Sequence, residues 1–207
     1  MSGSNDELPE HDSDFYRPDV YSAPYGTRVK AVIVGKGSSL DGLMPSVLAE
    51  DGEVFRVVFA INEAAHRVLE WHYQAPRWLQ WYLVQQDSEL GDSCFPTRGE
   101  TVALINRRVT VSPRQRCPVA IHPYDPGRFG CDDSTLTAII AVKIARLWGI
   151  KRLAFVAFDS WKDPKALGYY SKVPYAPGGY GRGDPQRFVQ HKALILKACE
   201  GCEVEVI

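Results

Sequence analysis

The sequence predicts an α/β domain with a mostly parallel sheet and helices on both faces. Short continuous apolar runs, typical of strands buried on both faces, alternate with segments of helical periodicity. No apolar run is long enough to span a membrane, and the chain does not start with a signal peptide's basic and apolar segments. The 207 residues suffice for one Rossmann-like domain with a core, which we expect to be cytoplasmic.

Residues 1–25 are expected to be a disordered acidic tail. They are rich in Ser, Asp, Glu and Pro and contain few aliphatic residues, so they cannot bury enough apolar area to offset the entropy of ordering. The remaining residues, 26–207, are expected to fold as one domain.

The elements of this domain follow one another in strand and helix order. Strands are expected over residues 30–34, 53–61, 79–84, 101–105 and 118–121. A helix is then expected over 134–148, with Leu136, Ile140 and Ile144 on one apolar face and Gly149 ending it. A core strand over 152–158, a helix over 186–199 and a strand over 202–207 complete the order. Alternating polarity places the last strand at a sheet edge.

Charge is unevenly distributed along the chain, although the net charge is only −1. Residues 106–197 contain 16 Lys and Arg against 6 Asp and Glu. Such a basic half favours an anionic ligand, either a nucleotide or a nucleic acid. An ordinary solvated face is the alternative.

A glycine turn follows the first strand directly, with the sequence Gly35-Lys36-Gly37-Ser38-Ser39. Two glycines allow the backbone to turn sharply and to approach a ligand closely, and Lys36 adds charge against a phosphate. Open α/β sheets bind ligands at such positions, so the turn is predicted to bind a nucleotide. The alternative is a purely structural tight turn.

Polar residues also end two further strands. Asn62 follows the second strand, and its amide suits a base or ribose edge, although Asn is also a common turn residue. Asp159 ends the strand that precedes the long loop, where its carboxylate faces the ligand crevice. Asp159 is therefore expected to hold a ribose, a metal ion or a loop backbone.

The start of the long helix is a further predicted contact. Asp133 or Ser134 is expected to cap it, and the hydroxyls of Ser134 and Thr135 are expected to reach the nucleotide. The carboxylates of Asp132 and Asp133 would repel a phosphate, so they favour capping or a divalent ion.

Residues 160–186 form an unusually long loop that is predicted to act as a lid. Tyrosines alternate with cations and glycines along it, a pattern that suits a phosphate-bearing or stacked ligand. A solvated flap is the alternative. Among the histidines, His122 and His191 are candidate general bases.

Five cysteines, an odd number, argue against a closed disulfide framework. Cys199 and Cys202 form a CxxC that lacks a second CxxC or CxxH, so we interpret them as free thiols rather than a metal or redox site.

The order of these motifs resembles the bacterial sialyltransferase-like fold, a superfamily that includes sialyltransferases using a CMP-sugar and proteins transferring diphosphate to 6-hydroxymethyl-dihydropterin. In this resemblance Asn62 and Ser134 or Thr135 match binding positions, and two tyrosines among Tyr169, Tyr170 and Tyr175 match those that hold the leaving phosphate. Lys36 and Ser38-Ser39 stand where the sialyltransferases have Asn and Pro-Ser. The catalytic histidine lacks a match, because Pro185 lies near its position and His191 comes about six residues later.

The sequence and the resemblance together predict a nucleotide-dependent transferase, a glycosyltransferase that moves a sugar from a nucleotide-sugar donor to a hydroxyl acceptor. His191, Tyr169, Tyr175 and Asp159 are its catalytic candidates. An anionic acceptor such as DNA, with a modified base in a phage setting, would fit the basic half. One alternative is a Mg²⁺-dependent diphosphotransferase, in which Asp87, Asp132, Asp133 and Asp159 supply carboxylates. The other is a catalytically idle nucleotide-binding module.

Overall fold

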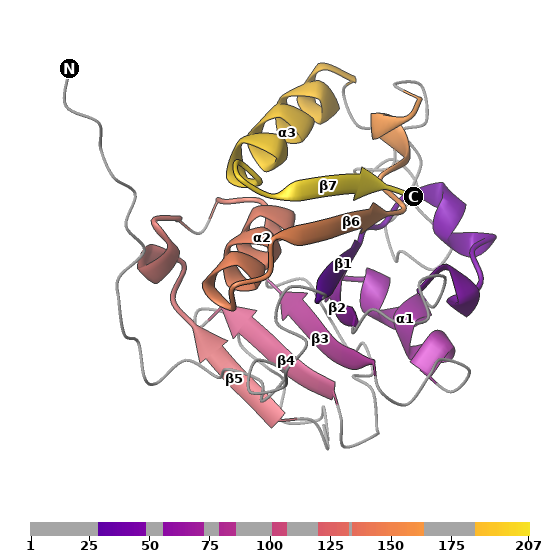
Figure 1. Ribbon diagram of the computed structural model, residues 1–207, viewed down its shortest axis with the longest axis horizontal. Coiled ribbons are helices and arrows are strands. Elements are labelled where there is room, and N and C mark those ends of the chain that lie inside the picture. Colours follow the sequence, from indigo (N-terminus) through magenta and orange to yellow (C-terminus); the bar gives the residue numbers. More distant parts are fainter. Residues whose placement is uncertain are drawn as a thin grey trace.

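The computed structural model describes residues 29–48, 56–72, 79–85, 101–106, 120–132, 134–163 and 185–207. Within these ranges seven strands form one sheet in which every neighbouring pair is parallel (Figure 1). The predicted fold class is therefore confirmed. The expected tail over 1–25 and most of the lid loop 160–186 lie outside the described residues.

The strands are arranged in the order β5-β4-β3-β2-β1-β6-β7. Their bounds are β1 Lys30–Val34, β2 Arg56–Ile61, β3 Gln80–Gln85, β4 Thr101–Asn106, β5 Ala120–Tyr124, β6 Arg152–Val156 and β7 Glu203–Val206. Strands β2 to β5 follow one another in chain order on one side of β1, and β6 and β7 lie on its other side. The strand order therefore reverses between β1 and β6.

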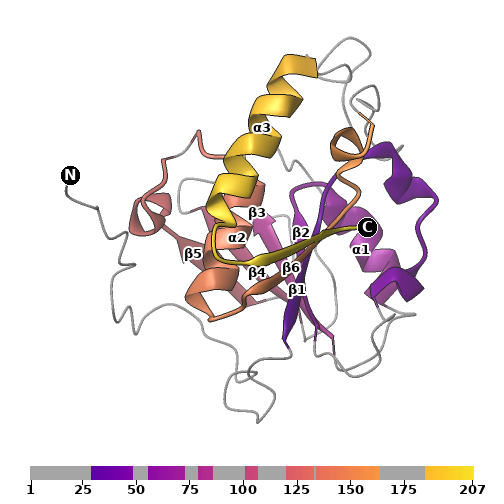
Figure 2. The same ribbon diagram turned by 45° about the horizontal axis from the view of Figure 1, so that its top comes forward.

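Among the described residues, three α-helices cover the two faces of the sheet. Helix α1 (Ala64–His72) packs on one face, and α2 (Thr137–Leu147) and α3 (Pro185–Ala198) lie on the other (Figure 2). The alternating side chains of β1 follow this division, because Ile33 belongs to the cluster around α2 and Val34 to the cluster around α1. Each cluster buries a Trp at most 2% exposed, Trp148 and Trp71 respectively.

Strand β7 occupies one edge of the sheet, as its alternating sequence predicts. The exposed carboxylates of Glu203 and Glu205 pair with Arg152 of β6 and Lys30 of β1. Charged side chains on an edge strand discourage pairing with a further strand. None of the described helices is long and apolar enough to cross a membrane.

Several boundaries differ from those expected from the sequence. Helix α2 begins at Thr137 rather than 134, and β6 ends at Val156 rather than 158. Residues 134–136 form a turn before α2, and Ala157 and Phe158 leave the strand conformation after β6. Asp159 therefore opens a short 3-10 turn (Asp159–Trp161) instead of ending the strand.

Candidate functional site

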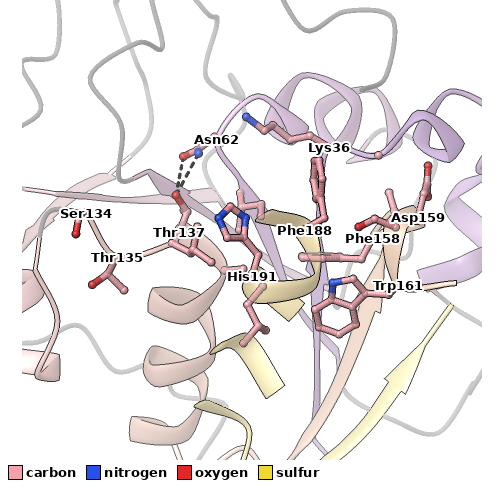
Figure 3. A pocket seen from close by; sticks show the side chains of 18 residues that line it. Lys36, Asn62, Ser134, Thr135, Thr137, Phe158, Asp159, Trp161, Phe188 and His191 are labelled. Atoms are coloured by element: carbon pink, nitrogen blue, oxygen red, sulfur yellow. Dashed lines mark hydrogen bonds between the residues drawn. The ribbon is translucent and has the colours of Figure 1, made fainter. Parts of the chain in front are cut away.

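A cavity of about 290 Å³ lies at the carboxyl end of the sheet, where the strand order reverses. Its wall is formed by the turn after β1 (35–37), the end of β2 (61–62), the start of α2 (134–138), the turn after β6 (157–161) and the α3 side chains Phe188, His191 and Ile195. Open α/β sheets bind their ligands at this position. The fold therefore brings most of the described candidate residues to one place (Figure 3).

The glycine turn approaches the protein's own backbone closely. The N–H groups of Gly35 and Gly37 donate to the carbonyls of Val156 and Ala157, at 2.8 and 2.9 Å. A Cβ at Gly37 would lie 2.6 Å from the Ala157 carbonyl oxygen, and one at Gly35 would lie 2.8 Å from the same atom. The sequence interpretation, in which the glycines give a ligand room, is thus incomplete: they first give room to the turn after β6.

The carboxylate of Asp159 connects these two turns through hydrogen bonds. It accepts a hydrogen bond of 2.7 Å from the Ser39 backbone N–H and another of 3.1 Å from the Ser38 hydroxyl. The Ser39 hydroxyl also donates to it. Of the three uses that the sequence leaves open for Asp159, the structure shows the loop-backbone one. Ser38 and Ser39, predicted to bind a nucleotide, point to Asp159 and do not belong to the cavity wall.

Two wall residues adopt left-handed backbone conformations at the ends of their strands. Asn62 has φ 48°, which Asn tolerates well, whereas Ala157 has φ 58° and is 2% exposed. Such strained positions cluster at functional sites. Asn62 was singled out by its residue type, but nothing in the sequence marks Ala157.

The buried amide of Asn62 connects β2 to the start of α2. Its Nδ2 donates to the Thr137 hydroxyl at 3.1 Å, and that hydroxyl also lies 3.3 Å from Oδ1 (Figure 3). Thr137 is 7% exposed and lines the cavity. Thr137 is not among the residues predicted from the sequence, because the helix was expected to begin three residues earlier.

The residues before α2 form a hydrogen-bonded turn around Asp132. Its carboxylate accepts from the Ser134 N–H at 2.9 Å and from the hydroxyls of Ser134 and Thr135, which hold its pKa below the usual range. The N-cap residue is Leu136, which offers no side-chain hydrogen bond to the helix. The expectation that Asp133 or Ser134 caps α2 is therefore wrong: the turn uses Ser134 locally, and Asp133 lies outside the described residues.

Lys36 projects from the glycine turn and pairs with Glu63, the second residue after β2. Its Nζ lies 2.7 Å from Glu63 Oε2, and the side chains are 15% and 6% exposed. Lys36 lines the cavity, whereas Glu63 is buried and does not line it. The predicted cation is thus present, with a carboxylate as its partner.

Aromatic side chains form the opposite end of the cavity. Phe158 and Trp161 pack together with ring centroids 5.1 Å apart, and both are only half-buried. On α3, His191 lies between this aromatic end and the start of α2, with Phe188 beside it at 6.2 Å between ring centroids (Figure 3). His191 is therefore placed at the cavity, as predicted. The sequence did not indicate this aromatic wall, because Phe and Trp next to an apolar strand are usually core residues.

The other candidates are not brought to this site by the described structure. Tyr169, Tyr170, Tyr175, Asp87 and Asp133 lie outside the described residues, as does the side chain of His122. Within the described ranges no group of three or more His, Cys, Asp and Glu side chains is arranged to hold a metal ion. The Mg²⁺ site of the alternative reading remains an expectation.

The CxxC lies away from the cavity at the end of α3. Cys199 and Cys202 are free thiols, as expected. Burial raises the pKa of Cys199 to about 12, and burial also raises that of Cys202. A raised pKa leaves less of the nucleophilic thiolate at neutral pH.

No protein family model matches the chain, and no curated protein or solved structure shows significant similarity to it.

Proposed function

We propose that this chain is a nucleotide-dependent glycosyltransferase, which holds a nucleotide-sugar donor in the cavity at the strand-order reversal. The observation that carries the proposal is the placement of His191 between the start of α2 and the half-buried aromatic end of one cavity. A site that offers an anion-binding end, a general base and an apolar end has the parts that group transfer from a nucleotide requires.

The start of α2 supports phosphate binding. The first N–H groups of a helix have no partner within the helix, and the helix dipole places partial positive charge there. In α2 the N-cap Leu136 supplies no side-chain acceptor, and Thr137 and Ala138 of the first turn line the cavity. A phosphate at this end would receive N–H donors directly, with Lys36 nearby.

His191 supports the chemical step. In the proposed reaction it takes the proton of the acceptor hydroxyl, and the acceptor oxygen forms a bond to the anomeric carbon of the sugar. The bond from that carbon to the donor phosphate oxygen breaks, and its electron pair leaves with the phosphate. The N–H groups of α2 would then stabilise the developing charge.

Asp159 favours this reaction over Mg²⁺-dependent diphosphate transfer. Such a transfer uses carboxylates to hold the metal ion, whereas Asp159 uses both carboxylate oxygens on Ser38 and Ser39. The acceptor, including a DNA base, is part of the proposal only as a hydroxyl-bearing group.

Nucleotide binding is the first test. Thermal unfolding with CMP, UDP, GDP, ADP and their sugar conjugates should show one preferred base, with a gain of roughly 2.7 kcal/mol in the free energy of unfolding at a hundredfold Kd. A chain that none of these ligands stabilises is not a nucleotide-dependent transferase.

Variants of α3 test the role of His191. We expect His191→Ala to reduce donor turnover by about 10²- to 10⁴-fold, with little change in nucleotide Kd. Gln190→Ala, an exposed neighbour outside the cavity wall, is the matched control and should keep full turnover. Turnover should also survive EDTA. Full turnover by His191→Ala would reject His191 as the general base. Loss of turnover in EDTA that Mg²⁺ restores would favour diphosphate transfer. Nucleotide binding without any turnover would indicate a binding module.

A further inference from the structure

The ion pair of Lys36 and Glu63 joins a cavity residue to a buried carboxylate that does not line the cavity. Lys36 follows β1 and Glu63 follows β2, and the parallel pairing of these strands brings the two residues together. The Nζ to Oε2 distance is 2.7 Å, and the Glu63 side chain is only 6% exposed. The carboxylate is therefore poorly screened by solvent and acts on any charge that reaches Lys36.

A ligand phosphate near Lys36 would interact electrostatically with both members of this ion pair. The ammonium attracts the phosphate, and the carboxylate behind it repels the phosphate. Each further negative charge on the ligand increases both effects, so the carboxylate offsets part of the affinity that a dianion gains from Lys36.

We propose that Glu63 sets the charge selectivity of the cavity by weakening the binding of terminal phosphate dianions more than the binding of phosphodiester monoanions. This inference rests on the proposed function and deepens it. In an intact nucleotide sugar every phosphate is esterified or part of an anhydride, whereas the released nucleotide ends in a phosphate that is largely dianionic above its second pKa of about 6. Glu63 thus disfavours the product relative to the donor and speeds its release.

Two simple probes separate charge from base recognition. Methyl phosphate is a dianion at pH 8 and dimethyl phosphate a monoanion, and both lack a base. Their affinities are measured by ³¹P NMR titration of the full chain. We expect Glu63→Gln to tighten methyl phosphate binding by roughly tenfold and dimethyl phosphate binding by clearly less, because one unit of charge is removed from a partly buried site.

Changes at Lys36 should act in the opposite direction. In Lys36→Gln, with Glu63 retained, selectivity should shift toward dimethyl phosphate. In the double variant Lys36→Gln/Glu63→Gln the affinity gained by Glu63→Gln should disappear relative to the unmodified chain. If the Glu63→Gln chain does not fold, as judged by circular dichroism and thermal unfolding, Lys36→Gln and the double variant still differ only at Glu63, and methyl phosphate should bind the double variant more tightly than Lys36→Gln.

The outcomes separate this inference from the proposed function. Equal changes for both probes, or a folded Glu63→Gln variant that binds neither, would overturn the role of Glu63 even if nucleotides bind and turn over. If the selectivity changes as expected but no nucleoside adds affinity, the role of Glu63 stands and the proposal of nucleotide binding is rejected.

Discussion

The glycine turn after β1 and the start of α2 belong to the same cavity but use their polar groups differently. In the glycine turn the N–H groups of Gly35 and Gly37 bind the backbone after β6, and Ser38 and Ser39 bind Asp159. At the start of α2, the first-turn residues Thr137 and Ala138 face the cavity without a side-chain cap from Leu136. The conspicuous motif thus builds the cavity wall, whereas the proposed anion contacts belong to the less conspicuous start of α2.

The largest expected effect tests whether the glycine turn is architectural. Gly37→Ala places a Cβ 2.6 Å from the Ala157 carbonyl oxygen and 2.7 Å from the Asp159 carboxyl carbon, so backbone must move. We expect the free energy of unfolding to fall by about 1–3 kcal/mol in urea titrations, with or without ligand. Gly42→Ala is the control, since its nearest atom, Ser39 O, lies at 3.8 Å. Equal stability of the two variants would show that the turn is not tightly packed.

An intermediate effect is expected at the start of α2. Thr137→Val removes the buried hydroxyl that bonds to Asn62 and should lower the free energy of unfolding by about 1–2 kcal/mol. Because α2 then loses its link to β2, phosphate affinity should fall as well. Thr137→Ser keeps the hydroxyl and should preserve both properties. Unchanged affinity in a destabilised Thr137→Val chain would argue that α2 does not contact the ligand.

The smallest effect is expected at Asp159, whose contacts are exposed to solvent. Asp159→Ala removes the acceptor of Ser38 and Ser39 and should lower the free energy of unfolding by about 0.5–1.5 kcal/mol. Asp159→Asn retains one acceptor oxygen and should lose less, as measured by thermal unfolding at matched pH. A fully stable Asp159→Ala that no longer turns over donor would instead assign the carboxylate to catalysis.

The sequence predicts the fold better than the details of the site. Buried parallel strands have continuous apolar runs, so β1, β2 and β6 could be located, and polar residues at their ends pointed to Asn62 and Asp159. The backbone conformations and the hydrogen-bonding and ion-pair partners of the site residues could not be predicted, because they depend on contacts between segments that are distant in the chain. The left-handed backbone of Ala157, the bond between Asn62 and Thr137 and the pairing of Lys36 with Glu63 are of this kind. The aromatic wall was missed because residue type alone does not separate a cavity wall from the core.

The reversal of strand order also determines when this site can form during folding. Ser39 and Asp159 are 120 positions apart in the chain, and β1 acquires its second neighbour only when β6 arrives. Contacts between such distant segments are slow to form, so the sheet from β1 to β5 can assemble while the cavity is still missing one wall. During that interval β1 is an open apolar edge, which is a template for pairing with other chains. Fast docking of α2 and β6 would shorten the time for which this edge is exposed.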